Sequence, residues 1–268
     1  MIEVLATRGL ATLQDAGRRG RMHEGVPPGG ALVPELLARA NSAVRNAYDA
    51  AAIELFGSMS LRAVAPAVVA ADDGEPISLA AGDTWAVPGS AARARYVAVR
   101  GGFDVPRILG GRGTLLVAGI GGYLGRALRA GDRLPVGDAP RHDDDALPPP
   151  PPDVFSPVRV VLGPDLDRFD RRAVAALLEA EFAVDARSDR IGTRLVGPAL
   201  PRTDADSGTS APMLRGAIQV PASGQPIVLG PDHPTTGGYP VIATIVRASL
   251  GAFGARPIGA PVRFALQR

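Results

Sequence analysis

The stretch GAIQVPASGQPIVLGPDHPTTGGYPVIATI, residues 216–245, indicates the fold of this chain more directly than any other segment. Its apolar runs are short, and each is bounded by proline or glycine, a pattern typical of buried β-strands. We therefore predict three strands here, at Ile218–Val220, Ile227–Leu229 and Val241–Val246. Polar loops rich in proline, glycine and threonine join them.

The loop before the last of these strands carries many hydrogen-bonding groups between residues that restrict the backbone. His233, beside Asp232, is a candidate general base, and Tyr239 is a candidate third catalytic group. The same loop supplies four candidate substrate-binding residues: Thr235, Thr236, Gly237 and Gly238. The alternative is a barrel rim whose polar groups are satisfied within the protein, because turns favour the same residue types.

Two further segments of the second half add candidate substrate-binding residues. Gln219 and Gln225 lie on or beside the predicted strands, with side chains that can both donate and accept hydrogen bonds. Ser188, Asp189 and Arg190 follow a strand signal at residues 183–185, and the arginine can clamp a carboxylate through two bonds. The alternative for these three residues is a polar turn that leads into the next strand.

A third polar loop lies near the N-terminus, in TLQDAGRRGRMHEGVPPGG at residues 12–30. Gln14, Asp15 and Arg18 are candidate substrate-binding residues, with Arg18 as a second possible carboxylate clamp. The alternative is that Asp15 and Arg18 pair with each other, since they are three residues apart.

Outside these loops the chain is mainly β with a few helices, in two β-rich domains. We predict an N-terminal domain at 1–146, a proline-rich linker at 147–152 that includes five consecutive prolines, and a C-terminal domain at 153–268. One helix is expected from Pro34 to about Asn46, and another begins with Asp165 as its N-cap. Further strands are predicted at Ile2–Leu5, Ile53–Phe56, Ala67–Ala70, Ile77–Leu79, Thr84–Val87, Arg95–Val99, Leu115–Ala118 and Val158–Leu162.

Composition excludes several kinds of chemistry. The 268 residues contain no cysteine, and all 29 basic residues are arginine, so thiolate nucleophiles, Schiff bases and a phosphate-loop lysine are absent. Aromatic residues form only 4% of the chain and the net charge is +2, which disfavours a nucleic-acid platform. The sequence shows no signal peptide and no apolar run of about 20 residues, so we expect a cytoplasmic protein without a membrane span.

Two local patterns fail as sites. The glycines at 119, 121, 122 and 125 do not have the spacing of a dinucleotide loop, and we predict a tight turn between strands there. His23, His142 and His233 are far apart in the sequence, so we expect no metal site.

Several motifs nevertheless resemble one family through nearly the whole chain. The chain is similar to the C subunits of bacterial 5-oxoprolinases, a family also described as allophanate hydrolase subunit 2, biotin-dependent carboxyltransferase-like or Kip-type antagonists. The motifs that carry this resemblance are TLQDAGRRG (12–20), GVPPGGA (25–31), ARANSAVRN (38–46), AAIEL (51–55), GGFDVPRILGGRGTLLVAGIGG (101–122), SDRIGTRLVGP (188–198), GAIQVPASGQPIV (216–228) and TTGGYPVIAT (235–244).

The resemblance implies a cyclophilin-like β-barrel architecture and a role within a larger enzyme. It implies two partners: the family's B subunit, which is related to a histidine-kinase inhibitor, and its A subunit. Together they would couple ATP hydrolysis to opening of the 5-oxoproline lactam. Because this chain has no lysine, we expect ATP to bind largely on a partner. The chain departs from the family pattern at Val241, where lysine is usual, and at His233, where arginine is common.

Two other functions stay open. One is a carboxyltransferase module of a urea carboxylase or allophanate hydrolase system, in which biotin would be carried by another chain. The other is a regulatory protein that binds the kinase-inhibitor-like partner without turning over a substrate.

Overall fold

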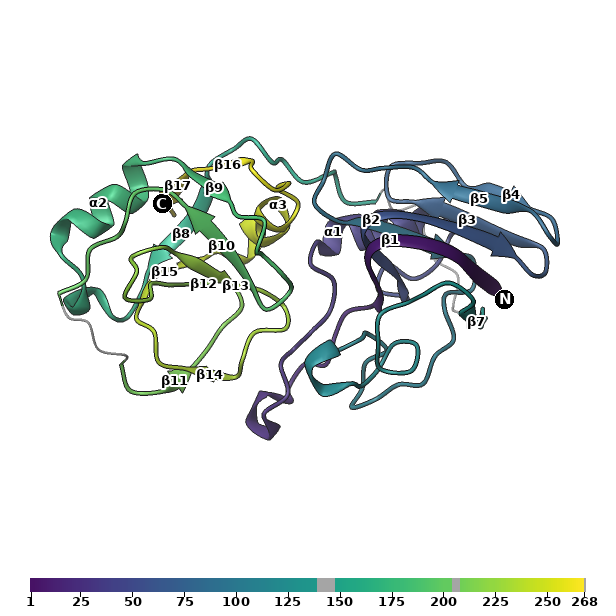
Figure 1. The fold of residues 1–268 in the computed structure, drawn as a ribbon, viewed down its shortest axis with the longest axis horizontal. Helices are drawn as coiled ribbons and strands as arrows, with labels where there is room; N and C mark the ends of the chain where they lie inside the picture. Colours follow the sequence, from purple (N-terminus) through teal and green to yellow (C-terminus); the bar gives the residue numbers. More distant parts are fainter. Residues whose placement is uncertain (139–147, 204–207, 268) are drawn as a thin grey trace. The chain divides into compact units, whose positions relative to one another are not determined.

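The computed structural model describes residues 1–138, 148–203 and 208–267. They form two compact units (Figure 1). Unit 1 comprises Met1–Arg19 and Gly29–Pro152, and unit 2 comprises Gly20–Pro28 and Asp153–Arg268. Of the predicted linker, Pro148–Pro152 carries no helix or strand, whereas Leu147 lies outside the described residues, as do the preceding residues 139–146 with His142.

Unit 1 is built on a seven-stranded sheet in the order β4-β3-β6-β2-β1-β7, with β5 paired to β2. The strands are β1 (Ile2–Gln14), β2 (Ala52–Ala63), β3 (Ala67–Ala71), β4 (Ile77–Leu79), β5 (Thr84–Val87), β6 (Arg95–Val99) and β7 (Arg133–Leu134). The long β1 and β2 run antiparallel, and Gly9 faces Gly57 where they cross. A Cβ on Gly9 would overlap the carbonyl of Phe56, so only glycine allows this close approach.

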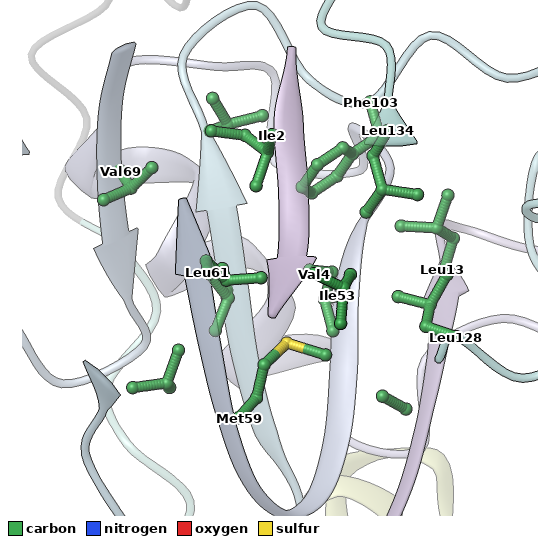
Figure 2. Close-up of a cluster of buried hydrophobic side chains, with 14 of the residues drawn as sticks. Ile2, Val4, Leu13, Ile53, Met59, Leu61, Val69, Phe103, Leu128 and Leu134 are labelled. Carbon is green, nitrogen blue, oxygen red and sulfur yellow. The ribbon is translucent and has the colours of Figure 1, made fainter. Parts of the chain in front are cut away.

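The core of unit 1 is formed by aliphatic side chains from one face of this sheet. Figure 2 shows Ile2, Leu13, Ile53, Leu61 and Leu134 converging between the strands, and each is at most 1% exposed. Burial of such side chains is the main favourable term in folding. The sheet therefore gives a rigid base for the loops that leave its ends.

Helix α1 (Pro34–Ala43) packs on β3 and β6, and η2 (Leu116–Ala118) is a short 3-10 helix in the loop before β7. The predicted start at Pro34 is confirmed, but the helix ends three residues before Asn46. Arg45 adopts a left-handed φ of 60°, which ends the helix, and Asn46 instead donates to the carbonyl of Val99. The strand predicted at Leu115–Ala118 is wrong, because η2 occupies it.

Unit 2 is an eight-stranded sheet in the order β16-β9-β10-β13-β12-β15-β8-β17. Its strands are β8 (Val158–Leu162), β9 (Phe182–Val184), β10 (Gly192–Val196), β12 (Ala217–Gln219), β13 (Ile227–Leu229), β15 (Val241–Ile245), β16 (Pro261–Val262) and β17 (Phe264–Leu266). A separate ribbon pairs β11 (Ala211–Pro212) with β14 (Thr236–Gly237).

The eight-stranded sheet curls into a nearly closed barrel. Its two outermost strands, β16 and β17, are separated in sequence by Arg263 alone. One residue cannot span a flat sheet of this width, so the two edges must meet. Figure 1 shows the strands of unit 2 curving around a common centre. The prediction of a mainly β protein with few helices and a barrel-like sheet is confirmed.

The helical segments of unit 2 are η1 (Met22–Glu24), η3 (Leu166–Arg168), α2 (Arg171–Glu179), η4 (Arg247–Ser249) and α3 (Leu250–Gly254). Asp165 was the expected N-cap, and this is wrong: the cap of α2 is Asp170, whose carboxylate accepts from the N–H of Arg172 at 2.8 Å. Phe169 is extended and separates η3 from α2. The carboxylate of Asp165 instead accepts from the N–H of Val241 at 2.8 Å.

Most short strands were predicted with accurate bounds, including Ile227–Leu229 and Thr84–Val87. The first strand is much longer than predicted and continues from Leu5 to Gln14. Gly9 looks like a strand end in the sequence, but here it lies opposite another glycine within the ladder. Among the described residues, no helix has the length and apolar character required to cross a membrane.

We predict that Asp170→Ala lowers the free energy of unfolding by about 1 kcal/mol, because the first turn of α2 loses its capping acceptor. Asp167→Ala is the matched control, since Asp167 is exposed in η3. Urea denaturation of both variants checks this, and equal stabilities would contradict the assignment of the cap.

Candidate functional site

A buried ion pair anchors the polar loop of unit 2. The guanidinium of Arg190 donates from Nε to Oδ2 of Asp232 at 2.8 Å and from Nη2 to Oδ1 at 2.9 Å. Both side chains are about 95% buried. This bidentate geometry is the strongest arrangement of an arginine and a carboxylate, and burial makes each charge dependent on the other.

The backbone on both sides of this ion pair is also joined by hydrogen bonds. The N–H of Asp232 donates to the carbonyl of Arg190 at 3.1 Å, and the N–H of Gly230 donates to the carbonyl of Ile191 at 2.8 Å. A Cβ on Gly230 would overlap the carbonyl of Arg190, so glycine is required at this crossing. The segment after β13 is thus held against the segment before β10.

His233 follows the ion pair and is completely buried. Its Nδ1 lies 2.8 Å from the carbonyl oxygen of Pro234, which can only accept. In the neutral ring Nδ1 therefore carries the proton and Nε2 presents a lone pair. Nε2 is buried and has no hydrogen-bond partner among the described residues.

The environment of His233 favours the uncharged ring. Burial lowers its pKa below the usual value of 6.5, and the nearby positive charge of Arg215 adds to this effect. The hydrogen bond to the Pro234 carbonyl and, to a smaller extent, the carboxylate of Asp232 oppose this lowering of the pKa. The acceptor that orients the imidazole is thus the Pro234 carbonyl, and not Asp232 as the sequence order suggested.

The remainder of this loop presents hydroxyl groups at the surface. Thr236 is exposed in β14, Thr235 is half-buried, and Tyr239 is 43% exposed. Gln219 lies beneath them, where its Nε2 contacts the sulfur of Met213 at 3.1 Å. That amide donates weakly to the carbonyl of Tyr239 at 3.4 Å.

The Gln219 amide nitrogen also defines the space beside Gly237, where a Cβ would lie 3.0 Å from it. Gly238 accepts through its carbonyl from the N–H of Gly208 at 2.6 Å. The structure therefore brings the predicted residues 232–239 and Gln219 together around one loop.

Three other predicted residues of unit 2 serve local structure. Asp189 accepts from the N–H groups of Ile191 and Gly192, which closes the turn before β10. Ser188 and Arg194 exchange hydrogen bonds across the same turn. The side chain of Gln225 pairs with the backbone N–H and carbonyl of Gly197.

In unit 1, Asp15 organises a loop. Its carboxylate accepts from the backbone N–H groups of Gly17 at 2.8 Å, Arg112 at 2.5 Å and Gly113 at 3.1 Å. Arg18 is 1% exposed and donates to the carbonyls of Ile108 and Gly113 rather than to Asp15. Asp15 thus binds backbone N–H groups of the loop around residues 108–113, and Arg18 binds backbone carbonyls of the same loop.

Gln14 belongs to the same buried network and donates to the hydroxyl of Thr12 and to the carbonyl of Thr114, both at 3.1 Å. The glycine-rich segment packs on this network. A Cβ on Gly121 would overlap the carbonyl of Gly113, and one on Gly122 would overlap the hydroxyl of Thr114. These glycines form turns in the loop that contains η2, and their backbone is packed against the protein's own chain.

A pocket of about 370 Å³ opens at the end of the unit 1 sheet where β1 stops and β2 begins. It is lined by Asp15, Asp49, Asp104, Arg107 and Arg112 among others. Arg112 pairs with Asp104 at 3.0 Å, whereas Arg107 is exposed. No group of three or more histidine or acidic side chains in the described ranges is placed to hold a metal ion.

Comparison with known proteins gives the family. The model of the carboxyltransferase domain, subdomain A and B, matches residues 24–266. The chain belongs to this family.

The proteins that are similar to this chain differ greatly in length. The chain is 36% identical to the 5-oxoprolinase C subunit of Escherichia coli, over 98% of this chain and 90% of that protein. The solved urea amidolyase of Kluyveromyces lactis superposes with a TM-score of 0.88 at 27% identity, over 100% of this chain and 19% of the longer protein. The urea carboxylase of the same yeast gives 0.86 at 26% identity, over 100% of this chain and 27% of that one.

The sequence did not indicate several residues that shape this carboxyltransferase-domain site. Arg215 and Met213 precede β12 and act on His233 and Gln219, but neither stands in a recognisable motif. Asp104 and Arg107, which line the pocket, do belong to a recognisable motif, GGFDVPR at residues 101–107. That motif alone could have identified both charged residues as candidate binding residues.

We predict that Asp232→Asn lowers the free energy of unfolding by about 3–5 kcal/mol, because the buried guanidinium of Arg190 loses its counter-charge. Glu181→Gln is the matched control in the same unit, since Glu181 pairs with Arg263 at the surface and its loss changes stability by only about 0.5 kcal/mol. Denaturant titrations measure both. Similar small losses would show that the buried pair does not anchor the loop.

Proposed function

We propose that this chain belongs to an ATP-dependent 5-oxoprolinase complex that hydrolyses the lactam of 5-oxoproline to glutamate. The observation that carries the proposal is the identity of 36% to the 5-oxoprolinase C subunit of Escherichia coli, which extends over 90% of that protein. The name of that relative describes one of several subunits. We propose two partners here, a kinase-inhibitor-like subunit (the B subunit of the family) together with the A subunit.

Opening the lactam adds water across a resonance-stabilised amide bond: the carbonyl carbon gains a hydroxyl group and the ring nitrogen gains a proton. Phosphoryl transfer from ATP to the carbonyl oxygen would release ADP; after water adds and the ring C–N bond breaks, a second water would hydrolyse the resulting acyl phosphate to glutamate and phosphate. Two features favour placing ATP on a partner. The chain has no lysine, and the backbone of its glycine-rich segment is packed against residues 113–114.

Within unit 2 we assign the contacts with the lactam to the 232–239 loop. Thr236 and Tyr239 offer exposed hydroxyl groups that can donate to the lactam carbonyl oxygen and, after phosphoryl transfer, to the oxygens of the phosphoryl group. The lone pair on Nε2 of His233 can take a proton from the attacking water and return it to the ring nitrogen. A lowered pKa keeps that nitrogen unprotonated near neutral pH.

Two features of the site modify the roles expected from the sequence. The His233 ring is completely buried, so substrate can reach Nε2 only if the protein around the ring opens. The guanidinium groups of Arg18 and Arg190 bind the protein's own carbonyl and carboxylate groups, so we assign them positioning roles. Within unit 1, Arg107 is exposed at the pocket and is a better candidate than Arg18 to meet an anionic ligand there.

A carboxyltransferase module is the second candidate. The family model and the superposition on the urea amidolyase favour it, because that longer protein contains a region of the same fold. In that case biotin would be attached to another chain, since there is no lysine here to carry it. A regulatory protein that only binds the kinase-inhibitor-like partner is the third candidate.

We predict that the chain, assembled with both proposed partners, releases glutamate from 5-oxoproline only when ATP is present, and that the chain alone releases none. His233→Gln should lower this rate by about a hundredfold or more, because the site loses its proton acceptor. His23→Gln, at an exposed position, should leave it unchanged. Glutamate is measured by a coupled dehydrogenase assay.

A complex that assembles but releases no glutamate would contradict the proposal. Biotin detected on a partner, together with carboxyl transfer to urea, would replace it with the second candidate. Binding to the kinase-inhibitor-like partner without turnover of either substrate would replace it with the third.

A further inference from the structure

The pocket at the end of the unit 1 sheet has a wall of small residues and several charged side chains. Its volume of about 370 Å³ lies in the range of small-molecule sites. Most of the lining residues are glycine or alanine, so the wall is largely backbone. Gly101, for example, has a φ of 94°, and a Cβ there would overlap the carbonyl of Gly137. The other lining residues are Phe103, Asp15, Asp49, Asp104, Asp138, Arg107 and Arg112.

Three of these charged side chains are engaged within the protein. Asp15 accepts from three backbone N–H groups, which stabilise its negative charge. Asp104 and Arg112 form an ion pair at 3.0 Å. These three groups therefore have little charge left to offer a ligand.

The other three charged residues of the pocket, Asp49, Asp138 and Arg107, are exposed. Within the described ranges, no ion pair joins any of them to another residue. The pocket thus presents one positive and two negative groups to a molecule that enters it.

The loops that carry two of these groups have fixed backbones. Asp49 lies in the turn at residues 47–50, which is closed by a backbone hydrogen bond of 3.0 Å and braced by the Asn41 amide at 2.8 Å. Arg107 directly precedes the turn at residues 108–111, whose end residues exchange two backbone hydrogen bonds. A site with a fixed backbone loses less entropy when it binds a ligand.

The charges of the pocket select the kind of ligand. A simple anion that approached Arg107 would also meet two carboxylates. A metal ion is not favoured, because no group of three or more histidine or acidic side chains in the described part of the chain is placed to hold one. A molecule with both a carboxylate and an ammonium group matches both signs, since guanidinium binds carboxylate and ammonium donates to carboxylates.

We propose that this pocket binds a small zwitterion, an α-amino acid, with its carboxylate on Arg107 and its ammonium group on Asp49 and Asp138. The inference does not depend on the proposed function, because it concerns unit 1 and binding alone. The substrate proposed above, 5-oxoproline, is not the expected ligand here. Its nitrogen is part of an amide and carries no positive charge.

The test begins with the wild-type chain alone and the twenty common L-amino acids as probes. We expect at least one of them to raise the thermal midpoint, because a ligand that binds the folded state stabilises it. Titration calorimetry then compares this amino acid with its N-acetyl derivative and its methyl ester. Each derivative lacks one of the two charges and should bind at least about tenfold more weakly.

Two variants test the assigned residues. Arg107→Gln and the double variant Asp49→Asn/Asp138→Asn should each weaken binding about tenfold. Their thermal midpoints without ligand should not change, since all three side chains are exposed. Arg129→Gln is the matched control, because Arg129 is exposed and does not line the pocket.

Three results would overturn the inference. The first is a chain whose thermal midpoint rises with none of the amino acids. The second is an N-acetyl derivative that binds as tightly as the free amino acid, which would show that the ammonium group is not recognised. The third is wild-type affinity in both pocket variants, which would place the ligand elsewhere on the chain.

Discussion

The buried pair of Arg190 and Asp232 is the constraint on which the candidate site of unit 2 depends, because two opposite charges in the interior are stable only together. Their bidentate contact joins the turn before β10 to the end of β13. The next residue is His233, so the position of its ring follows from where Asp232 is held. Arginine suits this role better than lysine would, since its planar group matches both carboxylate oxygens.

In unit 1 an aspartate and an arginine also fix a polar loop, but each binds backbone groups instead of the other side chain. Asp15 accepts from three backbone N–H groups and Arg18 donates to two backbone carbonyls, so the loop around residues 108–113 is fixed through its backbone polar groups. The most conspicuous polar residues of both units are therefore internal supports. The groups that remain accessible to a ligand include Tyr239 in unit 2 and Arg107 in unit 1.

The sequence correctly predicted structural elements that are determined by residues close together in the chain. The strand Ile227–Leu229 is defined by its own apolar residues and the proline and glycine around it, and it was found correctly. The cap at Asp170 was missed because Asp165 and Asp167 lie just upstream, and only the extended Phe169 selects among them. The pairing of Arg190 with Asp232 joins positions 42 residues apart, so it depends on strand order that one sequence does not display.

The proposed mechanism requires a neutral His233 whose Nε2, which has no hydrogen-bond partner among the described residues, offers a lone pair to the substrate. Nitrogen-15 NMR of the imidazole, recorded across pH on the assembled complex with and without 5-oxoproline, tests it most directly. We predict a protonated Nδ1 and a bare Nε2 near neutral pH, with an Nε2 shift that moves when substrate binds. A proton on Nε2, or an Nε2 shift that ignores the substrate, would contradict the role assigned to His233.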